Sequence, residues 1–218
     1  MGEGIHTIKS VPKTDRSYQR DTEKGLNRQE SYTVSKLEAQ IRNRKTEKGY
    51  VIDSNGNVIA ESVKGTANRA RFRAGSLRKD TILTHNHPTE GANSNLFGTM
   101  AGRIGVPFSA QDIRNAVKYD LKEVRAVTPT YTYSIRRPKG GWGDLNTALR
   151  ALDRYEYGSR SGAYSYATRQ MANTMRSGNM TRQRAKEISD RANVGTQYSL
   201  FKKMAKELGW DFTRRKAK

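Results

Sequence analysis

The segment from Tyr50 to Ala60 constrains the fold most strongly. It reads Y-V-I-D-S-N-G-N-V-I-A, so two β-prone runs flank a short polar stretch. Asn55-Gly56 supplies the residue pair that most readily adopts the positive φ angles of a tight hairpin turn. The pattern therefore predicts an antiparallel hairpin, and any fold proposed for this chain has to contain a β-sheet.

The rest of the central region adds strands and helices in alternation. Apolar or alternating runs predict further strands at residues 81–84, 123–128 and 131–136. Apolar residues at helical spacing predict helices at residues 34–41 and 110–119, and Ser109 is a favourable N-cap for the second. This order predicts an α+β fold in which helices flank a sheet.

The two ends differ from the centre. Residues 1–33 are polar and show no periodicity, which predicts a basic polar N-terminal arm. Residues 143–218 show helical apolar stripes, including stripes within 145–155, 164–175 and 198–208, and a further helix is expected at 181–192. We therefore expect a central domain at 34–142, followed by a basic α-helical extension at 143–218.

The charge of the chain favours polyanionic partners. It carries 41 Lys and Arg against 21 Asp and Glu, a formal net charge of +20. Tyrosines alternate with arginines in R-Y-E-Y-G-S-R-S-G-A-Y-S-Y-A-T-R, a pattern typical of stacking on nucleic-acid bases, although such rings also serve helix cores. Candidate DNA or RNA contacts are Arg154, Arg160, Arg169, Arg182 and Arg184.

Composition limits the metal chemistry that the chain can support. It has no cysteine and only three histidines, so a metal site would have to use His, Asp, Glu and water. No run of about 18 apolar residues predicts a membrane span. The expected location is the cytoplasm, here of a bacterial host, with packaging in a virion as a further possibility.

Two of the histidines lie in the motif T-H-N-H-P. His85 and His87 are two residues apart on a predicted strand, so their side chains point to the same side and can bind one ion. A catalytic zinc needs a third ligand, and Asp112, one turn into the helix capped by Ser109, is the natural candidate. Each residue alone has a simpler interpretation, as an exposed histidine pair, a helix cap or a first-turn carboxylate.

Taken together, H-N-H-P and S-A-Q-D resemble the His-x-His-Pro…Ser-x-x-Asp signature of the JAMM (JAB1/MPN/Mov34) metallopeptidases, which RadC-like proteins share. The resemblance covers residues 37–137 and implies a JAMM/cytidine-deaminase-like mixed sheet. It implies that His85, His87 and Asp112 bind Zn²⁺, that Glu47 acts as general acid/base, and that Ser109 stabilises an oxyanion. The implied substrate is a protein or peptide.

The pattern departs from the family in one respect and leaves two alternatives open. The 20 residues between Pro88 and Ser109 form a longer spacer than the family has. Two interpretations are open: the extra residues form a lid over the substrate, or they mark a fold that has lost catalysis. Glu38 also precedes the first strand, but Glu47 in E-K-G-Y-V-I stands directly before it. A nuclease is disfavoured, because HNH nucleases spread these three letters across a hairpin and a helix, whereas the letters are contiguous here.

The order of these motifs is closest to JAMM-like domains of bacteriophage and mobile-element proteins. Phage and mobile-element proteins include structural proteins, so a second function stays open. In that alternative the chain is a basic structural protein that associates with virion proteins or nucleic acid and keeps the fold without catalysis.

Overall fold

The computed structural model describes residues 25–66, 69–88, 107–155 and 198–217, together with positions 173 and 195. A six-stranded mixed sheet forms the centre, in the order β2-β1-β5-β6-β7-β8. Only β5 and β6 are parallel; their neighbours pair antiparallel. The strands are β1 (Gly49–Ile52), β2 (Val58–Glu61), β5 (Ile82–Asn86), β6 (Glu123–Val127), β7 (Tyr131–Arg136) and β8 (Asp211–Lys216). The expected α+β class is confirmed.

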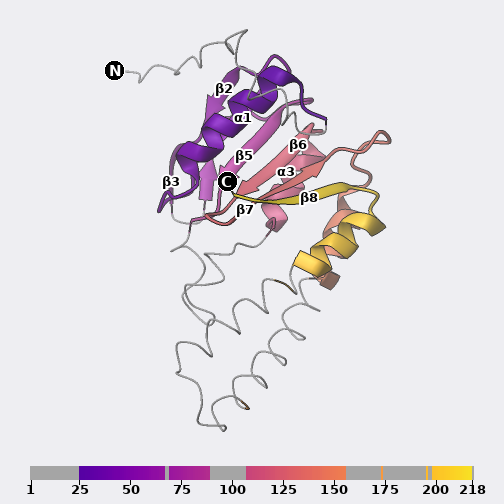
Figure 1. Ribbon diagram of the computed structural model, residues 1–218. Coiled ribbons are helices and arrows are strands. Elements are labelled where there is room, and N and C mark those ends of the chain that lie inside the picture. Colours follow the sequence, from indigo (N-terminus) through magenta and orange to yellow (C-terminus); the bar gives the residue numbers. More distant parts are fainter. Residues whose placement is uncertain are drawn as a thin grey trace.

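Helices cover both faces of the sheet (Figure 1). Helix α1 (Arg28–Ile41) packs on one face, where Val34 and Leu37 meet Ile52 and Ile82. Helix α3 (Ala110–Lys118) and helical residues 145–155 and 198–207 lie on the other face, around Leu83 and Val124. Because side chains alternate along each strand, neighbouring residues such as Ile82 and Leu83 enter different cores.

Helix α1 starts earlier than its apolar spacing predicts. It begins at Arg28, so residues 28–33 belong to the helix and not to a polar arm. The Asn27 side chain accepts from the Glu30 N–H at 2.9 Å, and the Glu30 carboxylate accepts from the Asn27 N–H at 2.7 Å. This reciprocal capping box satisfies N–H groups that a helix start otherwise leaves unpaired.

In the part that the structure describes, the chain beyond residue 142 contains the expected helices at 145–155 and 198–207, and these pack on the central sheet. Phe201, Met204 and Ala205 are buried in the same core as β6 and β7. After the helix ends near Gly209, the chain forms β8, which pairs antiparallel with β7 along its whole length. Apart from position 173, the predicted helices at 164–175 and 181–192 lie outside the described residues, as do residues 1–24.

A network of buried charges joins α1 to the sheet. Arg125 of β6 is fully buried, and its guanidinium donates to Glu38 of α1 at 2.6 Å and to Glu123 at 2.6 Å. Both carboxylates are themselves buried. Burial lowers the pKa of Arg125, but the two carboxylates together raise that pKa by more than burial lowers it. The net shift is upward and the guanidinium stays charged.

A second, two-stranded sheet pairs β3 (Val63–Thr66) with β4 (Arg69–Arg71). None of the helices that the structure describes is long and apolar enough to cross a membrane.

Candidate metal centre

Strand β5 positions the two histidines. It lies between β1 and β6, and its register pairs His85 with Gly49 on one side and with Ala126 on the other. His87 follows the last strand residue, and its N–H donates to the Val127 carbonyl at 2.8 Å, which extends the pairing. Both histidines therefore point to the face that α3 covers, as the two-residue spacing predicts.

Helix α3 brings the third residue. Its N-cap, Ser109, forms a capping box with Asp112 in which the Asp112 carboxylate accepts from the Ser109 N–H at 2.7 Å. The Ser109 hydroxyl also donates to that carboxylate, at 2.8 Å. These two hydrogen bonds orient Asp112 toward the histidines, so the cap has a direct consequence for the site.

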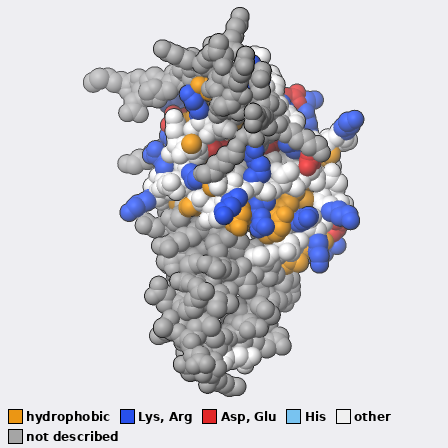
Figure 2. All heavy atoms as spheres, viewed as in Figure 1, with side chains coloured by type: hydrophobic (Ala, Val, Ile, Leu, Met, Phe, Trp, Pro, Cys, Tyr) orange, Lys and Arg blue, Asp and Glu red, His pale blue; other side chains and the backbone are white. Residues whose placement is uncertain are grey.

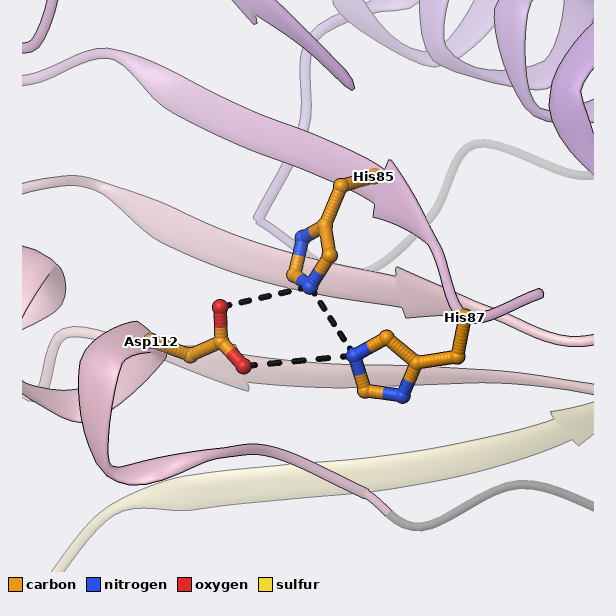
Figure 3. A group of neighbouring side chains, drawn as sticks. All are labelled: His85, His87 and Asp112. Atoms are coloured by element: carbon orange, nitrogen blue, oxygen red, sulfur yellow. Dashed lines mark hydrogen bonds and ion pairs between the residues drawn. The ribbon is translucent and has the colours of Figure 1, made fainter. Parts of the chain in front are cut away.

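The three side chains point toward one another, as Figure 3 shows. His85 Nε2 lies 3.1 Å from His87 Nε2 and 3.2 Å from Asp112 Oδ1, and His87 Nε2 lies 4.0 Å from Asp112 Oδ2. Ligands about 2.0 Å from a tetrahedral zinc lie about 3.3 Å from one another. The two imidazoles and the carboxylate each offer one ligand atom, all within 4.8 Å of one another, so the group can hold a metal ion.

The electrostatics of the site favour a cation. His85 and Asp112 are almost completely buried. Burial lowers the pKa of His85, but the charge and hydrogen bond of Asp112, together with the Glu47 carboxylate and the Arg125 backbone, raise that pKa, for a net shift to about 9. Burial raises the pKa of Asp112, yet the two histidines hold it far below its usual range. The raised pKa favours a proton on His85 beside the Asp112 carboxylate, and a bound cation would replace that proton.

Glu47 lies in the segment that leads into β1, close enough to His85 and Asp112 for their charges to act on its carboxyl group. Burial raises the pKa of its carboxyl, the charge of His85 lowers it, and Asp112 raises it again, with a net upward shift. The Ala70 N–H also donates to the carboxylate. Glu38, the alternative acid/base, points into the other face of the sheet and pairs with Arg125 there.

The small size of Gly49 allows β1 to pack closely against the histidine strand, a role that was not among the sequence predictions. A Cβ at this position would lie 3.0 Å from His85 Cβ, 3.0 Å from the Thr84 carbonyl oxygen and 2.9 Å from the Phe72 ring. Only glycine lets β1 pass this close to the histidine strand. The signal was present in the sequence, as a glycine directly before the hairpin predicted at Tyr50–Ala60.

Of the candidate nucleic-acid residues, the structure describes only Arg154. Arg154 is exposed and pairs with Glu207 at 2.5 Å, while Arg160, Arg169, Arg182 and Arg184 lie outside the described residues. On the face drawn in Figure 2, Lys and Arg side chains lie at scattered points of the described surface, with few acidic ones among them.

Comparison of the chain with protein-family models, with curated proteins and with solved structures found no match in any of the three. The arrangement of His85, His87 and Asp112 is therefore the structural basis for assigning a function.

Proposed function

We propose that the protein is a zinc-dependent metallopeptidase or isopeptidase of the JAMM type. The observation that carries the proposal is the convergence of His85, His87 and Asp112 at the end of a strand and the start of a helix, with His85 and Asp112 buried and His87 partly buried. Two imidazoles and one carboxylate form a ligand set typical of hydrolytic zinc enzymes, which leave a fourth position for water. The nearby Glu47, with its raised pKa, supports hydrolysis over a purely structural metal.

Each residue has a chemical role in this proposal. When bound, zinc supplies Lewis acidity and lowers the pKa of a water that it coordinates. His85, His87 and Asp112 hold the ion. The Glu47 carboxylate accepts the proton of the attacking water and passes it to the leaving amine nitrogen. Its raised pKa suits both steps, because a general acid/base works best when its pKa is near the working pH.

Ser109 is proposed to donate its hydroxyl hydrogen to the oxygen that becomes negative during attack. In the structure this hydroxyl donates to Asp112, and the Ser109 N–H donates to the same carboxylate oxygen. The backbone hydrogen bond can therefore keep Asp112 oriented while the hydroxyl turns toward substrate.

Chelation tests the function. Peptides and Lys-isopeptide-linked peptides with fluorogenic leaving groups are the probes. We expect the zinc-loaded protein to cleave at least one class, to lose cleavage after treatment with 1,10-phenanthroline, and to regain it when one equivalent of zinc is added. Cleavage that persists in the chelated protein, or a zinc-loaded protein that cleaves neither class, would count against the proposal.

A second candidate function is favoured by the net charge of +20, namely a basic structural protein bound to nucleic acid or virion proteins. It requires no metal, so its binding to DNA would survive the same chelation. The two functions are compatible, and the chelation experiment distinguishes them, because the chelator should abolish cleavage and leave DNA binding unchanged.

A further inference from the structure

Asn86 lies between the two histidines and points away from them. It is the last residue of β5, and its side chain enters the face opposite the metal centre because side chains alternate along a strand. The residue is completely buried. A buried amide in this position needs hydrogen-bond partners, and their identity connects it to the candidate site.

The partners all belong to the segment that carries Glu47. The Asn86 Oδ1 accepts from the Lys48 N–H at 2.7 Å, and the Nδ2 donates to the Arg44 carbonyl at 3.2 Å and to the Thr46 carbonyl at 3.3 Å. The Asn86 backbone N–H donates to the Lys48 carbonyl at 3.0 Å. One residue thus makes four hydrogen bonds to the chain between positions 44 and 48.

The geometry of these bonds places Glu47. They continue the β1–β5 pairing beyond Gly49 and His85, so that Asn86 lies opposite Lys48. Ser62 holds the other side of this segment, accepting from the Gly49 N–H at 3.0 Å. Glu47 is therefore held between two fixed neighbours, Thr46 and Lys48, with its carboxylate within electrostatic reach of His85 and Asp112.

We propose that Asn86 is a positioning residue that fixes Glu47 beside the metal centre by binding the 44–48 segment to the histidine strand. The inference rests on the proposed function. The strand that presents the metal ligands on one face would then hold the acid/base residue from its other face. Asparagine fits this role because it offers one acceptor and two donor hydrogens; aspartate lacks the donors and serine lacks the reach.

A double-mutant cycle on zinc affinity tests the inference without a substrate. The zinc dissociation constant is measured by competition with a chromogenic chelator for wild type, Asn86→Ala, Glu47→Gln and the double variant. Glu47→Gln should weaken zinc binding about tenfold, because a carboxylate beside the site favours the cation. Asn86→Ala should weaken it by a similar factor in wild type, but by less than about twofold in the Glu47→Gln background.

Thr84→Val is the matched control. Thr84 is buried on the same strand and the same face, but its hydroxyl donates to Glu38, so its loss should leave zinc affinity unchanged. Urea denaturation of each variant verifies that it is folded, and Asn86→Ser replaces Asn86→Ala in the cycle if the alanine variant does not fold.

Three results would overturn the inference. They are an equal loss from Asn86→Ala in both backgrounds, no loss in either, and a Glu47→Gln variant that binds zinc as tightly as wild type. A folded wild type that binds no zinc is a different outcome, which removes the proposed function itself.

Discussion

Arg125→Met should lower the free energy of unfolding by about 3–5 kcal/mol, because it leaves the buried carboxylates of Glu38 and Glu123 without the charge between them. Methionine fills much of the same space, so the effect reports lost charge pairing more than a cavity. Urea denaturation followed by circular dichroism measures it, as a lower midpoint with an unchanged slope.

Two further variants serve as controls for the Arg125→Met result. Arg154→Ala removes an arginine from an exposed pair with Glu207, and its unfolding midpoint should stay close to that of wild type. Adding Glu38→Gln to Arg125→Met removes the buried carboxylate whose only ion pair was with Arg125 among the described residues, while Glu123 keeps its pair with Arg136, and should recover much of the lost stability. An Arg125→Met protein as stable as wild type would show that the buried network does not hold α1 on the sheet.

Glu47→Gln should reduce kcat by about 10²–10⁴-fold on any probe that the wild-type protein cleaves. Glutamine keeps the size of the side chain but cannot accept the proton of the attacking water. Zinc content should be retained under saturating metal, because His85, His87 and Asp112 are unchanged. Steady-state kinetics on the best probe, together with elemental analysis of the same sample, measures both quantities.

Glu61→Gln provides the matched control. It makes the same chemical change on β2, the strand next to β1, where Glu61 pairs with Lys48 and not with the metal centre. Its kcat should equal that of wild type. A Glu47→Gln protein with wild-type kcat would contradict the assignment of Glu47 as general acid/base.

The sequence predicted those parts of the fold that depend on local signals. Asn55-Gly56 marked the hairpin of β1 and β2, and Ser109 marked the start of α3. The spacing of His85 and His87 predicted two side chains on one face of a strand. Asp112 joined them because the first turn of α3 faces the same end of the sheet.

The parts that were missed depend on contacts between distant segments. Strand β8 reads D-F-T-R-R-K, which has little apolar character, and it becomes a strand by pairing with β7, which lies 75 residues earlier at Arg136↔Asp211. Nothing local in the sequence shows that Glu38 and Arg125 are buried together. The early start of α1 did have a local signal, the Asn27…Glu30 capping box.

The position of Glu47 lies between these cases. Its place before a strand suggested the role, but its distance from the histidines depends on the β1–β5 register and on the hydrogen bonds of Asn86. Such register information is absent from a single sequence, since a shift by one residue would turn Glu47 to the other face.

The zinc content of the purified protein tests the central claim most directly. Elemental analysis should find about one zinc ion per folded chain of wild type, and close to none in the His85→Ala and Asp112→Ala variants, because each loses one of three protein ligands. A wild-type protein that is folded by circular dichroism yet binds no zinc, even after incubation with excess metal, would contradict the claim.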